Sequence, residues 1–453
     1  MKHSNINLSV QQLLPHRHHI DIIYKIDSFY FSTKLFYDNI DLYHLNEKYT
    51  QDYMYKIYCH IALIEGLKYC SVFPKFFDLS QIADGLSESS LSFFTHTYRN
   101  AYTQNMYENN ISTYEGPELI FNQPLGSNKT ISLDSGNDDI LMGNGGGKDS
   151  LLLAKILEKA NMNFSLFQWA RSEYGKFDYQ YNLSSKLCKH ITPKEIHPII
   201  IYDDFTDGIF VKRYYPNLAP PFTLGTPECI FEALPIILDK NYHYLTFGNE
   251  KSSDTGNLFW EDLGREVNHQ WIKSFEAETL FNSFIRNHLI SNFNYFSLFK
   301  PIYDFRIFQK VSQYPEALPD MHSCNIYKPW CKKCPKCAYV WLGYLAFFDT
   351  EAVNKVFKTN PFDDPDLFHF YKQLVGANDH KSFECVGNIE ESRFYMKKCI
   401  DKGLKGNALR MFEQEILNKQ QIDWNVIERK YTTVDFNRHN IPDNIFQMCK
   451  QFL

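Results

Sequence analysis

The sequence has no long run of like charge and no apolar run long enough to cross a membrane. Its 453 residues contain 47 Lys and Arg against 53 Asp and Glu, a formal net charge of −6. Nucleic-acid-binding proteins usually carry a strongly basic patch, so we do not expect nucleic acid as a partner. The first residues, MKHSNINLSVQQ, also lack the apolar core of a signal peptide. We therefore expect a cytoplasmic protein with no membrane partner.

A disulfide framework is not expected either, although cysteine is not rare. The 11 cysteines are odd in number and four of them crowd into one short cluster, so reduced thiols are the expected state. No internal repeat or low-complexity tract is present. A chain of this length should form about two or three domains. The sequence gives no indication of the oligomeric state.

The clearest motif lies at 139–161, in the segment DILMGNGGGKDSLLLAKILEKAN. Its apolar start predicts a short strand, and leucines and isoleucines at helical spacing predict a helix capped by Asp149 or Ser150. Between them, glycines without side chains let main-chain N–H groups close around phosphate oxygens at a helix N-terminus. A glycine-rich turn without a ligand is the alternative interpretation.

Spacing separates this loop from two other phosphate-binding loops. A Walker A loop would need glycine at Met142 and serine or threonine at Asp149. A dinucleotide-binding fingerprint beginning at Gly143 would need its third glycine at Lys148. The loop is instead similar to the Ser-Gly-Gly-x-Asp-Ser loop of the N-type ATP pyrophosphatases, with glycine in place of the first serine. The matching residues are Gly145, Gly146, Gly147, Lys148, Asp149 and Ser150.

After residue 130, strand-like and helical segments alternate, as a parallel sheet covered by helices requires. Strands are predicted at 164–170, 197–204, 242–250 and 295–302, and helices at 179–190 and 228–238. Polar or glycine residues stand at the strand ends, at 143, 171, 203–204 and 248–251. Ligands bind at the carboxyl ends of such strands, so we expect these positions to converge on one pocket. The predicted fold is α/β, with a doubly wound parallel sheet.

Three regions are predicted along the chain. Residues 1–128 form an N-terminal α+β module, to which no chemistry can be assigned from its residues. Residues 129–349 hold the glycine-rich loop and a cysteine cluster, and we interpret them as the ATP pyrophosphatase domain. Residues 350–453 are polar with helical patches and are predicted to form a C-terminal helical region.

Four cysteines in the segment CNIYKPWCKKCPKC form the second motif, namely Cys324, Cys331, Cys334 and Cys337. Each C-x2-C step can present two thiolates to one metal, and four sulfurs make the closed tetrahedral shell of a structural zinc site. An iron–sulfur cluster and unligated core cysteines are the alternatives. The following segment, AYVWLGYLAFF, is apolar around most of a helix and should be buried.

Further segments narrow the resemblance. The loop and the cysteine cluster together resemble the 7-cyano-7-deazaguanine synthase branch of the pyrophosphatases. The segments FGNEKSSDTGN from Phe247, VNHQWIKSFEAE from Val267 and KSFECVGNIEE from Lys381 resemble the ATP-dependent UDP-N-acetylmuramoyl-L-alanyl-L-glutamate epimerases of peptidoglycan synthesis. This resemblance covers residues 140–391. It implies a HUP-like sheet with a PP-loop, a UDP-linked muramoyl dipeptide as substrate, and ATP, Mg²⁺ and structural Zn²⁺ as cofactors.

The resemblance also implies that ATP is cleaved to AMP and pyrophosphate. A Cα–H beside a carboxylate is very weakly acidic, because deprotonation would place a second negative charge next to the first; adenylation removes the first charge. The loop would hold pyrophosphate while Asp149 positions Mg²⁺. The candidate catalytic residues are Cys385, as the base for the carbon acid, His269 and Glu250. Candidate ligands of the anionic substrate are Lys251, Arg265, Asn268 and Arg306.

Other interpretations stay open at this point. Cys385 is equally compatible with a buried structural cysteine, and the charged candidates with solvated surface. An amidating or nitrile-forming ligase, like the deazaguanine synthases, would use the same acyl adenylate with ammonia as the nucleophile. A nucleotide-sensing or defence-associated module would bind ATP without turning over a metabolite, although the intact Lys148, Asp149 and Ser150 argue against an inactive loop.

Overall fold

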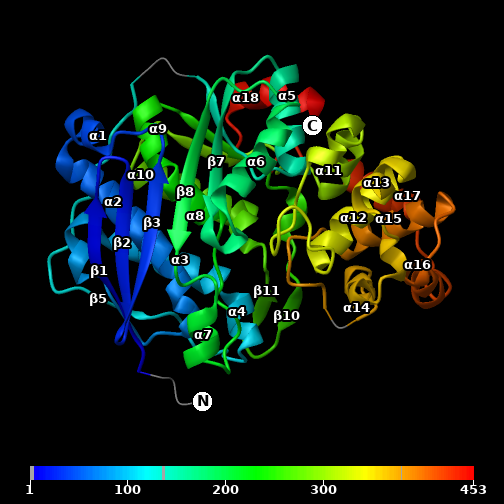
Figure 1. Cartoon of the computed structure of the whole chain (residues 1–453), viewed down its shortest axis with the longest axis horizontal. Helices are drawn as coiled ribbons and strands as arrows, with labels where there is room; N and C mark the ends of the chain where they lie inside the picture. The colour runs from blue at the N-terminus through cyan, green and yellow to red at the C-terminus, as the bar shows by residue number, and fades with distance from the viewer. Residues whose placement is uncertain (1–4, 135–137, 379) are drawn as a thin grey trace.

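The computed structural model describes residues 5–134, 138–378 and 380–453. Within them a ten-stranded sheet has the order β12-β9-β6-β7-β8-β3-β2-β1-β4-β5 (Figure 1). Its strands are β1 (Asn7–Pro15), β2 (His19–Ile26), β3 (Phe29–Tyr37), β4 (Phe76–Asp78), β5 (Glu118–Ile120), β6 (Ile140–Gly143), β7 (Phe164–Arg171), β8 (Ile196–Asp203), β9 (Tyr244–Phe247) and β12 (Asn294–Ser297). The strands β10 (Leu258–Trp260) and β11 (Arg265–Val267) form a separate antiparallel pair.

The five strands from β12 to β8 run parallel. In β6, Ile140 and Met142 pack into the core on one face of the sheet and Leu141 into the core on the other, as the two-residue period of a strand dictates. The helices of this half are α5 (Lys148–Lys159), α6 (Phe177–Cys188), α7 (Ile209–Tyr214), α8 (Thr226–Glu232), α9 (Leu234–Lys240), α10 (Phe275–His288) and α11 (Asp304–Val311). The predicted α/β architecture with a large, mostly parallel sheet is confirmed. The HUP-like assignment stays a prediction.

The N-terminal strands continue the same sheet. β1, β2 and β3 are antiparallel neighbours, and β3 pairs antiparallel with β8, placing Leu35 opposite Ile201. The helices of this segment are α1 (Leu42–Tyr49), α2 (Gln51–Glu65), α3 (Glu88–Ala101) and α4 (Thr103–Glu108). One hydrophobic core joins Ile57 of α2 to Ile201 and to Phe284 of α10. Residues before 128 thus share a sheet and a core with those after it, and the predicted limits at 128 and 349 stay predictions.

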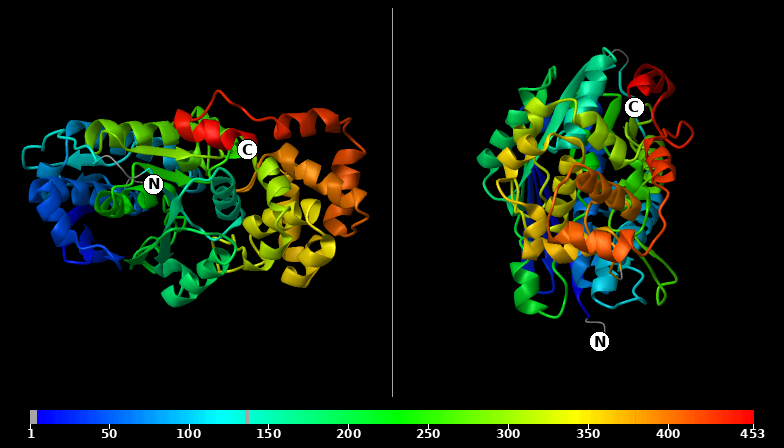
Figure 2. Two further views of the ribbon diagram at one scale, coloured as in Figure 1. Left: turned by 90° about the horizontal axis from the view of Figure 1, so that it is seen from above. Right: turned by 90° about the vertical axis from the view of Figure 1, so that its right-hand side faces the viewer.

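Most of the C-terminal helices form a group beside the sheet, and the last of them lies apart from the group, near α5 (Figure 1, Figure 2). The C-terminal helices are α12 (Pro335–Phe347), α13 (Thr350–Phe357), α14 (Pro365–Leu374), α15 (Ile389–Asp401), α16 (Asn407–Phe412), α17 (Trp424–Thr432) and α18 (Asp443–Cys449). α12 is the expected buried helix after the cysteines, with Trp341 fully buried. These helices share a core with α5 and α11. No helix among the described residues combines the length and apolar character needed to cross a bilayer.

Candidate active site

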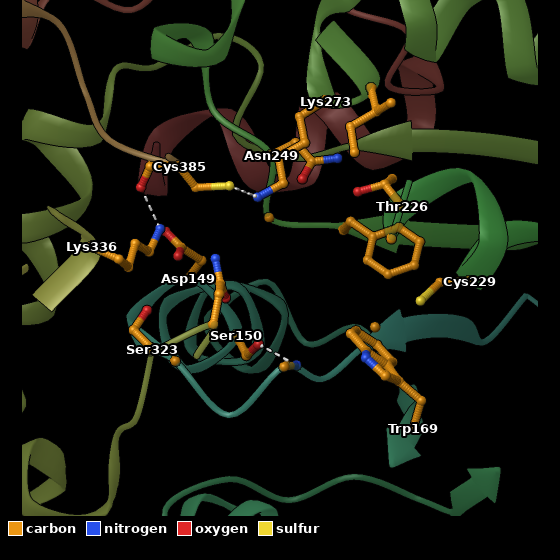
Figure 3. A pocket seen from close by; sticks show the side chains of 18 of the residues that line it. Asp149, Ser150, Trp169, Thr226, Cys229, Asn249, Lys273, Ser323, Lys336 and Cys385 are labelled. Atoms are coloured by element: carbon orange, nitrogen blue, oxygen red, sulfur yellow. Dashed lines mark hydrogen bonds between the residues drawn. The ribbon is translucent and has the colours of Figure 1, made fainter. Parts of the chain in front are cut away.

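A cavity of about 470 Å³ opens at the carboxyl ends of β6, β7 and β9 (Figure 3). That is where open parallel sheets bind ligands. The predicted strand ends Gly143, Arg171 and 248–250 line it. Asp203 does not line the cavity. Its carboxylate instead forms a 2.6 Å ion pair with the buried Lys68 of the N-terminal segment. Separate stretches of the chain supply the walls, chiefly 143–150, 169–184, 221–229, 247–250, 269–273 and 322–336.

The glycine-rich loop joins β6 to α5 and forms one wall. Gly145, Gly147, Lys148, Asp149 and Ser150 line the cavity. α5 begins at Lys148 with Gly147 in the cap position, so the prediction that Asp149 or Ser150 caps the helix is wrong. The Ser150 hydroxyl instead accepts a 3.1 Å hydrogen bond from the Gly145 N–H and closes the loop.

Among Gly145, Gly146 and Gly147, Gly146 alone has a left-handed backbone. Its φ is +75°, and a Cβ built on it would lie 2.0 Å from Cε1 of His322. The Gly146 carbonyl accepts a 2.9 Å hydrogen bond from the His322 N–H. Gly146 therefore does not face the cavity but lets the loop pack against the segment that carries the cysteine cluster.

Lys148 is buried and held by two carboxylates. Its Nζ lies 2.7 Å from Asp149 and 2.5 Å from Asp304. Burial alone would lower the pKa of Lys148, but the two carboxylates raise it above the usual value, so the amine stays charged. Asp304 also accepts a 2.8 Å hydrogen bond from the Tyr339 hydroxyl of α12. Asp304 had no motif around it in the sequence, and its role emerges only from this long-range contact.

Glu250 lies on the same side of the cavity, just after β9. Burial and the nearby carboxylates of Asp304 and Asp149 raise the pKa of Glu250 to about 7. A carboxyl group with this pKa exchanges a proton near neutral pH, as general acid–base catalysis requires.

Cys385 reaches the cavity from the loop before α15, on the opposite wall from the glycines (Figure 3). Its Sγ accepts a 3.0 Å hydrogen bond from Nζ of Lys273, and Nε2 of His269 lies 3.8 Å from the same sulfur. Lys336 donates a 2.6 Å hydrogen bond to the Cys385 carbonyl. Burial opposes ionisation of the thiol, but the Lys273 charge lowers the pKa of Cys385 to about 6.

The structure therefore brings together Cys385 and His269, which are 116 residues apart in the sequence. Lys273, the closest partner of the thiol, was not predicted as a site residue. It lies in the VNHQWIKSFEAE segment, in a single 3₁₀ turn at Trp271–Lys273. A lone lysine in such a segment carries no signal of its own, since only the fold shows that a thiol faces it.

Four predicted substrate ligands do not line the cavity, and each bonds to a neighbouring part of the fold. These contacts join Lys251 to Asp435, Arg265 to Asn100, Asn268 to the carbonyl of Ser253, and Arg306 to the carbonyl of Leu453. Such contacts position chain segments, and substrate binding by these four residues stays a prediction.

The four cysteines of the cluster converge at the edge of the cavity wall, with all sulfurs within 4.8 Å of one another. The Sγ atoms of Cys324 and Cys334 are 3.9 Å apart, and those of Cys331 and Cys337 are 3.7 Å apart. Four sulfurs about 2.3 Å from one tetrahedral zinc ion would stand about 3.8 Å apart, so the donor set fits zinc. Backbone N–H groups of 326, 327 and 331 point at Cys324 Sγ, at 3.4 Å each, as expected for a thiolate.

Comparison with known proteins finds two family models that match parts of the chain. A family model described as the MurL N-terminal domain matches residues 235–298, and one described as the MurL C-terminal domain matches residues 320–422. Both matches are to MurL domains, and they support a relation of this chain to the MurL family. No solved structure matches the chain at a significant level.

Three MurL relatives are named UDP-N-acetyl-alpha-D-muramoyl-L-alanyl-L-glutamate epimerase. The protein from Salinispora tropica is 28% identical over 55% of this chain and 52% of its own length. The protein from a Micromonospora strain is 27% identical over 68% and 67%, and that from Xanthomonas oryzae pv. oryzae 27% over 46% and 47%. The matched region thus spans about half to two thirds of each relative.

The two MurL matches contain much of the cavity. Glu250, His269 and Lys273 lie in the first, and the four cysteines and Cys385 lie in the second. The predicted relation to MurL is confirmed. The glycine-rich loop and α4 lie outside both matched ranges, and membership of the ATP pyrophosphatase superfamily stays a prediction.

Proposed function

We propose that this chain inverts the α-carbon of the terminal glutamate in UDP-N-acetylmuramoyl-L-alanyl-L-glutamate, with ATP as a second substrate. The observation that carries the proposal is one cavity, in a chain related to the MurL family, that joins a glycine-rich loop to the Cys385–Lys273–His269 cluster. The first is suited to phosphate and the second to proton transfer. The names of the relatives supply the substrate.

ATP is needed because the glutamyl carboxylate blocks deprotonation next to it. In the proposed reaction a carboxylate oxygen attacks the α-phosphorus of ATP, and pyrophosphate leaves. The resulting acyl adenylate has no carboxylate charge, so the electron pair of the broken Cα–H bond can enter its carbonyl. A proton added to the other face of the planar carbon inverts it, and water then releases AMP.

The loop would bind the departing pyrophosphate. The free N–H groups at the start of α5 would favour an anion, as at any helix N-terminus, and Lys148 adds a fixed positive charge. Asp149, with one oxygen on Lys148 and a position on the wall, is the residue that would hold Mg²⁺. Mg²⁺ would offset phosphate charge during the transfer.

Cys385 is the proposed base, because the Lys273 charge favours its thiolate at neutral pH. Two groups that flank one carbon from opposite faces must lie about 6 Å apart, since each approaches to about 3 Å. Cys385 and His269 are only 3.8 Å apart, so they act on the same face as one unit. Glu250, with its pKa raised to about 7, is our candidate for the proton donor on the other face.

The four cysteines would hold a structural zinc ion. The chain between Cys324 and Cys337 also supplies Asn325, Lys328 and Lys336 to the cavity wall. A metal at this position would fix that wall and the start of α12, whose first turn contains Cys337.

Proton NMR in deuterated water tests the proposal. The purified protein is incubated with the UDP-muramoyl dipeptide, ATP and Mg²⁺, while AMP and the glutamyl α-proton are followed together. Loss of the α-proton signal in step with AMP release is the expected result. The Lys148→Ala variant should show neither AMP release nor α-proton exchange, and Cys385→Ser should show no α-proton exchange. Release of AMP that requires ammonia, without α-proton exchange, would instead identify an amidating ligase.

A further inference from the structure

The N-terminal segment reaches the proposed catalytic cluster through one side chain. Gln104 of α4 is buried, with 7% of its surface exposed. Its Oε1 lies 2.5 Å from Nδ1 of His269, the imidazole whose other nitrogen faces Cys385. No motif pointed to Gln104, and α4 lies outside both MurL matches.

A hydrogen bond to Glu108 fixes the orientation of the Gln104 amide. Its Nε2 donates a 3.0 Å hydrogen bond to Oε1 of Glu108, one turn further along α4. An ionised carboxylate only accepts hydrogen bonds, so the amide nitrogen must face Glu108 and the amide oxygen must face His269. A flipped amide would place its oxygen against the Glu108 carboxylate and lose that hydrogen bond.

An amide oxygen is also only an acceptor, so the nitrogen of His269 that faces it must carry the proton. His269 is thereby held in the Nδ1–H form. Its Nε2, which lies 3.8 Å from Cys385 Sγ and 3.9 Å from a Glu384 oxygen, keeps a lone pair directed at the reacting side. This lone pair can take the proton that the thiolate has removed from substrate.

Packing holds α4 in this position. The Tyr107 ring makes edge contacts with Trp260 of β10 and with Phe383, two residues before Cys385. Met106 joins the same small core. α4 lies beside β11, the strand that precedes His269 (Figure 1).

We propose that Gln104 is a positioning residue of the epimerisation step, through the contact of its amide oxygen with Nδ1 of His269. Gln104 touches neither substrate nor thiol and acts by keeping Nε2 free to accept a proton. This assignment gives the N-terminal segment a chemical role. It rests on the proposed function for its consequence but not for its geometry.

The direct test is the protonation site of His269 in the free protein. Nitrogen-15 NMR of the histidine-labelled chain, at about pH 9 where free histidine is neutral, distinguishes protonated from unprotonated ring nitrogens, and the variant His269→Asn assigns the signals. The wild-type chain should carry the proton on Nδ1. Gln104→Met, which has similar length and only a weakly accepting sulfur in place of the amide oxygen, should move the proton to Nε2 in part or fully. A wild-type proton on Nε2, or no change in Gln104→Met, overturns the proposal.

The kinetic test separates positioning from general damage. Gln104→Met should slow α-proton exchange by at least about tenfold, because a general acid–base group contributes about 10²–10⁴ in rate. ATP–pyrophosphate exchange, which reports adenylation, should stay within about twofold of wild type, well below the tenfold step of 1.4 kcal/mol. The double variant Gln104→Glu, Glu108→Gln swaps the amide and the carboxylate. Its carboxylate at position 104 can still accept from Nδ1–H of His269, so α-proton exchange should stay near the wild-type rate. Thr103→Val, which removes a side-chain hydrogen bond to the Asn100 carbonyl one residue before Gln104 on α4, is the matched control and should change neither rate.

The outcomes also separate this proposal from the proposed function. A wild-type chain with neither AMP release nor exchange would end the epimerase proposal and leave the NMR test of Gln104 intact. Equal loss of both half-reactions in Gln104→Met would mean a structural role and overturn the positioning role.

Discussion

The charge of Lys273 should determine the reactivity of Cys385, and the variant Lys273→Met tests this. Methionine keeps the length of the side chain but removes the ammonium group 3.0 Å from Sγ. The pKa of Cys385 is lowered from 9.0 to about 6 against the opposing effect of burial. At pH 7 a thiol of pKa 6 is about 90% ionised, whereas one of pKa 9 is about 1% ionised.

Because Lys336 remains in place, we expect Lys273→Met to raise the pKa of Cys385 by only part of this difference. Alkylation of Cys385 by iodoacetamide at pH 7 should slow by at least about tenfold, since the thiolate is the nucleophile. The alkylation rate is measured as a function of pH, and peptide mass spectrometry identifies the alkylation that occurs at Cys385. The midpoint should move to higher pH in Lys273→Met and stay near 6 in Lys273→Arg, which keeps the charge.

The control is Lys155→Met, which removes a surface lysine paired with Glu158 on α5. Its alkylation profile should match that of the wild-type chain. An unchanged midpoint in Lys273→Met would refute the electrostatic argument, because the variant removes the positive charge that lies 3.0 Å from the sulfur.

Three further predictions follow from the cavity. Gly146→Ala should abolish ATP-dependent pyrophosphate release, because its Cβ would lie 2.0 Å from His322; Gly145→Ala, with its nearest atom at 4.0 Å, should fold normally. Cys331→Ser should lower both zinc content and Tm, and removing zinc from the wild-type chain with a chelator should lower Tm similarly. The pH profile of kcat/KM should be bell-shaped: its acid limb reflects ionisation of the thiol near 6, and its alkaline limb reflects loss of the Glu250 proton near 7. Glu250→Gln should remove the alkaline limb along with most of the exchange.

Local patterns in the sequence were enough to predict the parts of the site that depend on local structure. The strand, loop and helix at 140–159 follow from an apolar run, glycines and helical spacing, and the structure contains them as β6 and α5. The cysteine cluster is equally local, because its four ligands lie within one short segment. Cys385 and His269 were named from family-like segments, and their contact was not visible in the sequence.

Contacts between distant segments could not be predicted in this way. The sheet continues from β8 into β3 because two antiparallel strands with apolar faces align, and nothing in either strand specifies that partner. Asp304, Lys273 and Gln104 are ordinary polar residues on short helices or turns, without periodicity or motif. Their proposed roles come from contacts with residues at least 112 positions away in the chain, which only the fold brings close.

The same contacts bear on how the cavity assembles. Lys148 and Asp304 are 156 residues apart, and Lys273 and Cys385 are 112 apart, yet each lysine is charged and largely removed from water. Leaving such a charge without its partner costs about 3–5 kcal/mol, a large part of the stability of a typical domain. A misplaced C-terminal segment would therefore be penalised at the same atoms that perform the proposed chemistry. Correct packing of the cavity and the reactivity of Cys385 thus depend on such buried charge pairs.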